Sequence, residues 1–264
     1  MFIGLLLRFI VIGGLVPLLV SACRPENEAY ERKFLIRSIA SSEDAYIDKG
    51  VLTFDYNGDQ QLINATVSFK STQSTIAQSF SYSPGHITMT VVPAPTESGV
   101  LSATYSLNSA GYITKITSTE RVDGSTSPQL VTQSFSYTKD GFLSGQEYAD
   151  GTSKSFTYLD HNFFVERHYH DGIQAAAYNY YYSPNTPSTI TPLGGISTFA
   201  PFYRQGLFGL QVANAVRETS NIRGTTTYSY TYDDRGNATS VSQTYQAGNR
   251  PPQTTTLTYT YTCP

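Results

Sequence analysis

Apolar and aromatic residues alternate with small hydroxyl residues along most of this chain. The stretch Leu257–Thr262 reads Leu-Thr-Tyr-Thr-Tyr-Thr, and similar runs recur from Val51 onward. A period of two residues places the aromatic side chains on one face of an extended strand and the hydroxyls on the other. Helical periodicity is almost absent, so the alternation predicts strands with one apolar and one polar face.

Short turn sequences separate the alternating runs. Gly or Asn at these points supplies the positive φ angle that tight hairpins need. The turn pairs are Asn57-Gly58, Pro84-Gly85, Ala110-Gly111, Asp123-Gly124, Asp140-Gly141, Asp150-Gly151, Asp171-Gly172 and Arg235-Gly236. They predict a succession of antiparallel hairpins.

An internal repeat underlies the alternation: an aromatic residue, any residue, Tyr, a turn that usually contains Gly, and an apolar residue that opens the next strand. Copies begin at Phe54, Phe80, Phe135, Phe156 and Tyr230, and in the fourth copy Asn162 stands in place of Gly. Repeated units of this kind bury their apolar faces on their neighbours. The predicted fold class is therefore all-β, a strongly curved antiparallel sheet or barrel-like array of Tyr-rich hairpins.

One segment, at about 184–212, interrupts the repeat. It is rich in Pro, Gly, Ser and Thr, and it carries the apolar runs Phe199–Tyr203 and Leu207–Leu210. A loop of this length inside a compact domain is usually functional or disordered. Because of its apolar content, we expect this insert, with one short helix, to pack against the aromatic face of the sheet as a plug or lid.

The N-terminal segment 1–22 is predicted to be a signal peptide. Its apolar run, Phe9–Val20, is too short and too broken by Gly and Pro to span a bilayer. It ends in Val20-Ser21-Ala22-Cys23, which resembles the lipobox of bacterial lipoproteins. The resemblance implies cleavage before Cys23 and lipidation of its thiol, and two or three acyl chains suffice for stable membrane anchoring.

The rest of the chain is predicted to comprise a lipid anchor and tether, 23–48, and an antiparallel β domain, 49–264. No Asp follows Cys23 directly, which favours the outer membrane over retention at the inner membrane. Glu26 and Glu28 resemble surface-export signals, and a solvated tether accounts for them equally well. The expected location is the outer membrane, on its periplasmic or its surface face.

The late hairpin Tyr230–Asn237 reads Tyr-Thr-Tyr-Asp-Asp-Arg-Gly-Asn and resembles the Tyr-Asp repeat of large bacterial wrapping-shell proteins. The layout of Val51–Thr262 more closely resembles a family of lipoprotein domains of unknown function from Gram-negative bacteria, described as having a porin-like fold. The shared features are the lipobox, the aromatic-x-Tyr hairpins, the insert and the late Tyr-rich hairpin. The resemblance implies the fold and brings no known activity or site residue.

A transmembrane barrel also alternates apolar and polar residues. Three features argue against one here. The apolar face is mostly Tyr, a lipid anchor is redundant on an integral barrel, and the chain ends in Cys263-Pro264 rather than in an aromatic residue. These features favour a curved sheet in water, approaching closure, with aromatic residues lining its inside.

Composition excludes several classes of partner and site. A net charge of −3 with 14% charged residues leaves no basic face for nucleic acid. The 21 Tyr and 14 Phe argue against disorder. If Cys23 carries lipid, Cys263 has no partner within the chain, so neither a disulfide nor a cysteine metal cluster is expected. Alternation places Cys263 on the face of Leu257 and Tyr259, where it would be buried.

No catalytic residue, metal site or cofactor is predicted. His168 and His170 share a strand face at a spacing that can chelate a metal, but no third ligand is evident, and surface histidines beside a hairpin explain them. Asp233 and Asp234 could act as paired carboxylates, but their place in a turn accounts for them. Neither a Gly-x-Ser-x-Gly elbow nor a phosphate loop or dinucleotide fingerprint occurs in the sequence.

Two rows of tyrosines are the candidate ligand-binding residues. One row comprises Tyr178, Tyr180 and Tyr182, and the other comprises Tyr228, Tyr230 and Tyr232. Such rows can form a core in which each hydroxyl finds a partner, or a platform for sugar rings or an apolar ligand. Both interpretations stay open at this stage.

The sequence thus favours a non-enzymatic envelope lipoprotein that binds a glycan, a lipid or an envelope protein. A structural or assembly component of the envelope is the alternative. A hydrolase is a third hypothesis, and it requires titratable groups that converge in one cleft.

Overall fold

The computed structural model describes residues 35–42, 50–69, 72–94, 99–122, 127–188, 201–202, 205–208, 210 and 213–262. The chain divides into two compact units, Met1–Arg32 and Lys33–Pro264, and all described residues belong to the second. Among them, no helix is long and apolar enough to cross a membrane. The two cysteines, Cys23 and Cys263, lie outside the described residues, so the predictions for them stay predictions.

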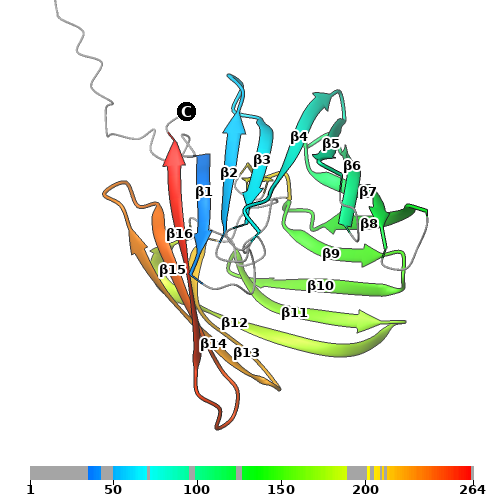
Figure 1. Cartoon of the computed structure of the whole chain (residues 1–264). Coiled ribbons are helices and arrows are strands. Elements are labelled where there is room, and N and C mark those ends of the chain that lie inside the picture. The colour runs from blue at the N-terminus through cyan, green and yellow to red at the C-terminus, as the bar shows by residue number, and fades with distance from the viewer. Residues whose placement is uncertain are drawn as a thin grey trace, which may run out of the picture. The chain divides into compact units, whose positions relative to one another are not determined.

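The second unit is a closed antiparallel barrel in which each strand pairs with its neighbours in sequence and β1 also pairs with β16 (Figure 1). The all-β fold class is confirmed, and the curved sheet is fully closed. The strands are β1 (Leu35–Ser41), β2 (Val51–Tyr56), β3 (Leu62–Ser68), β4 (Thr75–Ser83), β5 (His86–Val92), β6 (Gly99–Leu107), β7 (Ile113–Arg121), β8 (Gln129–Tyr137), β9 (Leu143–Tyr148), β10 (Thr152–Leu159), β11 (Asn162–His170), β12 (Ile173–Pro187), β13 (Asn214–Asn221), β14 (Gly224–Tyr232), β15 (Ala238–Gln246) and β16 (Gln253–Thr262).

The alternation in sequence determines the two faces of the barrel wall. On β16, Thr255, Leu257 and Tyr259 are buried, whereas Thr258 and Thr260 between and beyond them are exposed. Buried residues from most of the strands form one core cluster inside the barrel, and Tyr228 and Tyr230 of β14 pack against it. The prediction of an aromatic inside and a hydroxyl-rich outside is therefore confirmed.

Outward hydroxyls bond to one another across neighbouring strands. Ser38 lies 2.7 Å from Thr260, Ser242 lies 2.8 Å from Thr256, and Thr244 lies 2.9 Å from Thr254 (oxygen to oxygen). Transmembrane barrels have the reverse arrangement, with an apolar band outside and a polar lumen. At these positions on β1, β15 and β16 the outer wall is polar.

Bulges recur near one end of the barrel, and inward tyrosines satisfy the backbone there. A bulge leaves a carbonyl without its ladder partner, and a buried carbonyl needs a donor. Each of these hydroxyls donates to the carbonyl at a bulge of the preceding strand: Tyr56 to Ile36, Tyr82 to Leu62, Tyr137 to Ile113, Tyr230 to Val216 and Tyr261 to Ala238, at 2.5–3.0 Å. The Tyr of the repeat therefore has a structural role in the copies that begin at Phe54, Phe80 and Phe135.

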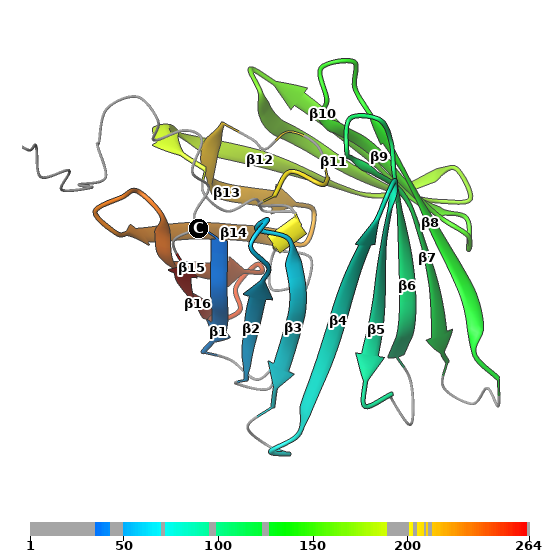
Figure 2. The same ribbon diagram turned by 90° about the horizontal axis from the view of Figure 1, so that it is seen from above.

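The same end holds the described part of the insert, and we call it the plug end. Phe202 is 0% exposed and packs edge-on against Phe80 and Tyr105, at ring-centroid distances of 5.3 and 5.4 Å. Phe208 packs on Phe135 at 5.3 Å. The described part of the insert is drawn in yellow within the ring of strands in Figure 2. Its described residues pack on the aromatic face, as the apolar content predicted.

Backbone bonds fix the insert to the turns of the plug end. The Leu210 amide donates to the carbonyl of Gly141 at 2.9 Å, and the Ile113 amide donates to the carbonyl of Leu207 at 2.7 Å. The Gln205 side chain donates to the carbonyl of Gln60 at 2.6 Å. These bonds join the insert to three separate hairpins of the wall.

Some local expectations differ from the structure. β1 lies inside the segment 23–48 expected as a tether, because Leu35, Ile36 and Ile39 pack into the core and its backbone pairs with β2 and β16. β12 continues to Pro187, into the segment expected as the insert. The turn before β11 takes its positive φ angles at Asp160 (49°) and His161 (61°) rather than at Asn162.

Candidate functional site

A cavity of about 430 Å³ opens in the barrel interior between strands β11 and β16, toward the end opposite the plug, which we call the mouth end. Its lining includes residues near the mouth-end termini of their strands, such as Thr226, Tyr245 and Gln253. Its volume falls within the range of small-molecule sites, about 300–1,000 Å³. The full lining is Glu166, His168, Tyr178, Tyr180, Thr219, Thr226, Tyr228, Gln243, Tyr245, Gln253 and Thr255.

A charged cluster forms one wall of this cavity. Lys154 on β10 pairs in register with His168 on β11, and Glu166 precedes His168 by two positions, so all three side chains face inward. One oxygen of Glu166 (Oε1) lies 2.6 Å from His168 Nε2 and 3.3 Å from Lys154 Nζ. Its second oxygen (Oε2) accepts a 2.7 Å hydrogen bond from the hydroxyl of Tyr180.

These contacts keep the Glu166 carboxylate ionised. Burial alone would raise its pKa, but the Tyr180 hydrogen bond, the charge of Lys154 and the contact with His168 together outweigh burial and lower the pKa below its usual range. The pKa of Tyr180 is raised, first by burial and then by the adjacent Glu166 charge, so Tyr180 stays protonated and remains a donor. The cluster is a fixed ion-pair network, 7% exposed at Glu166.

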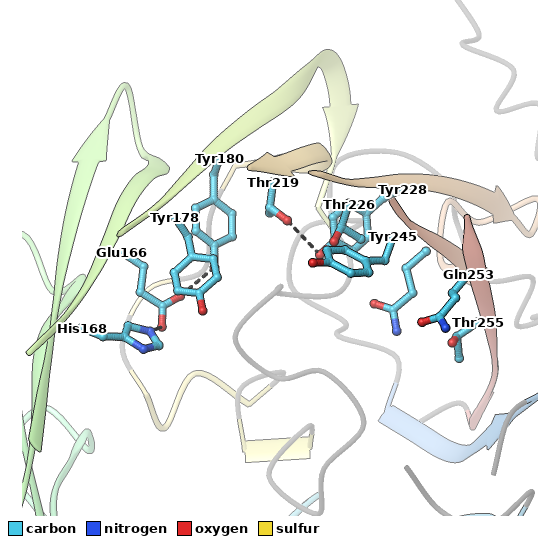
Figure 3. Close-up of a pocket in the computed structure, with 11 residues that line it drawn as sticks. Glu166, His168, Tyr178, Tyr180, Thr219, Thr226, Tyr228, Tyr245, Gln253 and Thr255 are labelled. Atoms are coloured by element: carbon cyan, nitrogen blue, oxygen red, sulfur yellow. Dashed lines mark hydrogen bonds and ion pairs between the residues drawn. The ribbon is translucent and has the colours of Figure 1, made fainter. Parts of the chain in front are cut away.

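Aromatic rings, hydroxyls and amides form the other walls (Figure 3). The Tyr178 ring lies 5.0 Å from the ring of His168 (centroid to centroid), and the Tyr228 hydroxyl lies 3.4 Å from that of Thr219. Tyr245 donates to the carbonyl of Arg223 at 3.3 Å, which holds its ring at the mouth. In Figure 3, Glu166, His168, Tyr178 and Tyr180 stand on one side, and Tyr228, Tyr245, Gln253 and Thr255 on the other.

The structure divides the predicted tyrosine rows between cavity and core. Tyr178, Tyr180 and Tyr228 line the cavity. Tyr230 donates to the carbonyl of Val216 at 2.7 Å, and Tyr182 packs against the core cluster. Tyr232 stacks on Tyr230 with a 6.0 Å centroid distance and is 37% exposed. Each row therefore runs from the cavity toward the plug end, with a structural role at that end.

The remaining candidate residues behave as turn and surface groups, with one exception. Asp233 accepts backbone hydrogen bonds from Arg235 and Asn237 within its turn, as expected for an Asp at this position. His170 is exposed and lies 3.6 Å from Asp171. His168, by contrast, belongs to the cavity. Among the described residues, no group of three or more His, Cys, Asp or Glu side chains is placed to hold a metal ion.

Sequence reasoning missed Glu166, Lys154 and Gln243. The spacing Glu166-x-His168 on a strand signals a shared face and could have been read as an inward charged pair. Lys154 comes into contact only through the register between β10 and β11, which no pattern within one strand encodes. Gln243 similarly reaches the cavity through its register with Tyr228 on β14 and Thr255 on β16.

No protein-family model matches the chain, and no curated protein matches it. Two solved structures are similar in fold. A porin-like protein from Bacteroides uniformis aligns with a TM-score of 0.68 and 18% identity, covering 87% of this chain and 98% of the other. A porin-like protein from Bacteroides vulgatus aligns with a TM-score of 0.56 and 10% identity, covering 87% and 99%. The porin-like fold implied by the sequence resemblance is confirmed.

The arrangement is suited to binding. Glu166 is the single carboxylate among the residues that line the cavity, whereas most glycoside hydrolases act through a pair of carboxyl groups. Glu166 is also already bonded to three donors. A carboxylate offers about four lone-pair positions, so about one remains for a ligand. The tyrosine rings and the Gln and Thr side chains supply apolar faces and hydrogen-bonding groups around the same space.

Proposed function

We propose that this protein is a non-enzymatic lipoprotein of the bacterial cell envelope that binds a glycan in the cavity at the mouth end of its barrel. The observation that carries the proposal is the composition of the cavity wall. Ring faces of Tyr178, Tyr228 and Tyr245 meet the amides of Gln243 and Gln253 around one space. The envelope location rests on the lipobox that ends at Cys23.

A sugar ring matches this wall chemically. One face of the ring is formed by C–H groups and packs on an aromatic ring, while its hydroxyls require donors and acceptors at the edges. The remaining lone pair of Glu166 accepts a ligand hydroxyl, and the two glutamine amides both donate and accept. Lys154 balances the charge of Glu166 at 3.3 Å, which favours a neutral ligand over a charged one.

Binding fits this barrel better than conduction through a membrane. The outward positions carry paired Ser and Thr, as at Ser242 and Thr256, where a membrane barrel has its apolar band. The described insert residues fill the plug end, where Phe202 is 0% exposed. A lipid on Cys23 then supplies the membrane attachment that the wall does not.

A glycan array followed by titration calorimetry tests the proposal. The chain from Cys23 onward is screened, and each hit is titrated against wild type, Tyr178→Ala and Tyr181→Ala. Tyr181 is a matched control because it lies on the same strand but does not line the cavity, and it is 40% exposed. We expect Tyr178→Ala to weaken binding about tenfold or more, which corresponds to about 1.4 kcal/mol, and Tyr181→Ala to leave it unchanged.

Four outcomes would count against the proposal. Binding to no glycan would favour a structural role in the envelope. Equal losses for Tyr178→Ala and Tyr181→Ala would place the ligand outside the cavity. Turnover of the bound glycan would make the protein a hydrolase, and single-channel conductance in planar bilayers would make it a pore.

A further inference from the structure

A second cavity, of about 300 Å³, lies in the wall of the barrel between strands β11 and β12. Its lining includes Phe164 of β11 and three consecutive tyrosines of β12, Tyr180–Tyr182. Tyr180 is 8% exposed and bonds to Glu166 inside the barrel, whereas Tyr181 is 40% exposed on the outside. The lining therefore combines residues from both faces of the wall, which requires an opening in the sheet.

The pairing of β11 with β12 stops before either strand ends, and this explains the opening. Registered pairs run from His170 with Ile173 to Val165 with Asn179. Beyond that point, the described residues of β11 pair with β10 and those of β12 pair with β13, and none pairs across. The wall is thus split beside Asn162–Phe164, and the second cavity lies in this split.

Apolar side chains gather at the outer rim of the split. Leu159 is 57% exposed and Phe164 is 43% exposed, and both line the cavity together with Tyr181. The outward positions described on β1, β15 and β16 carry Ser and Thr instead. Exposed apolar side chains that converge on one opening are typical of a binding site, because they offer a surface on which an apolar group can pack.

Two opposite charges complete the lining of the split. Asp160 lies in the turn that opens β11, and Arg217 lies at a bulge of β13. Within the described part of the chain, neither side chain forms an ion pair or a hydrogen bond. A guanidinium binds a carboxylate through two parallel hydrogen bonds, and a carboxylate binds an ammonium group. The rim can therefore hold a ligand that carries both charges.

We infer that the split is a second binding site, which takes a short zwitterionic peptide with an apolar side chain. The peptide carboxylate bonds to Arg217, its amino group bonds to Asp160, and its apolar side chain packs on Phe164 and Tyr181. This site lies outside the glycan cavity, so the inference does not depend on the proposed function.

The spacing of the two charges favours a peptide over a free amino acid. β12 lies between β11, which Asp160 precedes, and β13, which carries Arg217. The backbones at the two charges are therefore about two strand spacings apart, or about 10 Å. A free amino acid carries its amine and its carboxylate on one carbon atom. An extended chain of about three residues spans about 10 Å.

Titration calorimetry with tripeptides tests the inference. The probes are Ala-X-Ala peptides with free ends, in which X is Phe, Tyr, Leu or Val. The controls are the same peptides with acetylated and amidated ends, and free phenylalanine. We expect the free-ended peptides to bind. Blocking both ends should weaken binding about tenfold or more, because each end then loses a hydrogen bond to a charged group.

Matched variants locate the bound peptide. Arg217→Gln should weaken binding about tenfold, whereas Arg250→Gln, in an exposed turn away from the split, should leave it unchanged. Tyr181→Ala should also weaken peptide binding, and Tyr178→Ala should not. This is the reverse of the result expected for the glycan, so the same two variants report on both sites.

Four results would overturn the inference. These are binding to no tripeptide, equal affinity for free and blocked ends, equal losses for Arg217→Gln and Arg250→Gln, and a loss of peptide affinity in Tyr178→Ala, which would place the peptide in the glycan cavity. Thermal denaturation checks that each variant is folded. Glycan affinity is measured separately on the same proteins, so failure of one site is distinguished from failure of the other.

Discussion

The sector β4–β9 and the sector β11–β16 are built from the same hairpin repeat, yet one is filled and the other holds a cavity. In the first, inward residues such as Phe80 and Phe135 pack against the insert residues Phe202 and Phe208. In the second, inward positions carry Tyr, Thr, Gln, Glu and His, and about 430 Å³ stays open. The repeat determines the wall, and the identity of the inward residues determines whether the interior is core or site.

The largest effect is expected where the filled sector depends on one side chain. Phe202→Ala removes a ring that is 0% exposed and contacts Phe80 and Tyr105. Loss of a buried Phe costs about 3–5 kcal/mol. Urea denaturation should show this loss, while glycan affinity in the other sector should not change. Phe164→Ala is the control, because Phe164 is 43% exposed and should cost much less. Equal costs for the two variants would mean that the insert does not stabilise the barrel.

The charged cluster of the open sector gives the next largest effect. Glu166→Gln leaves Lys154 and His168 without their anion. We expect the free energy of unfolding to fall by about 2 kcal/mol at neutral pH. This is less than for a fully buried pair, because the Lys154 side chain is 31% exposed. The pKa of Glu166 is lowered in the folded protein. The ionised Glu166 therefore makes its full contribution to the free energy of unfolding above the unfolded pKa, about 4.3. This contribution is lost as the pH falls through the lower pKa of the folded protein.

Denaturation of wild type and Glu166→Gln across pH 3–7 measures this difference (a range set by the unfolded pKa of about 4.3). The gap in unfolding free energy between the two proteins should be constant near neutral pH and should close toward the acidic limit. A gap that widens as pH falls would contradict the ionised state of Glu166. Asp59→Asn serves as a control, because Asp59 is exposed in a turn outside the cavity.

The bulge tyrosines test what the two sectors share. Tyr82→Phe and Tyr230→Phe each remove a donor to a part-buried carbonyl, that of Leu62 or that of Val216. An unsatisfied carbonyl costs about 1–3 kcal/mol, so we expect about 1–2 kcal/mol from each variant in thermal denaturation. Burial raises the pKa of Tyr82 to about 12, so its hydroxyl remains a donor under ordinary conditions. Tyr181→Phe, on an exposed side chain, should cost nothing measurable. A loss confined to one sector would show that the repeat is not equivalent around the barrel.

The sequence was sufficient to predict the faces of the wall, because a period of two residues encodes them directly. The alternation Leu257-x-Tyr259-x-Tyr261 specifies the inward face of β16, and the structure agrees. The start of the barrel was not evident, since Leu35–Ser41 has no repeat motif and a bulge between Ile36 and Ser38 breaks its alternation. Leu35–Ser41 can be recognised as a strand only from its long-range pairing with β16.

The site was only half predictable for the same reason. Tyr178 and Tyr228 were identified because rows of aromatic residues are visible within single strands. The ion pair of Lys154 with Glu166 depends on the register between strands β10 and β11, which is a property of the assembled sheet. Which end of a tyrosine row lines a cavity depends in addition on where the insert packs, and that requires the closed barrel.

The smallest expected effect lies outside the barrel and tests its sidedness. Thr255 is buried at the cavity, and the next residue, Thr256, points outward and bonds to Ser242 at 2.8 Å. Thr256→Val should change the free energy of unfolding by no more than about 0.5 kcal/mol, because water at the surface can replace the hydrogen bond that Ser242 loses. It should also leave glycan affinity unchanged in calorimetry, whereas Thr255→Val removes a lining hydroxyl and should weaken it. Since the two positions differ only in the face on which they lie, equal effects on affinity would mean that the ligand does not bind inside the barrel.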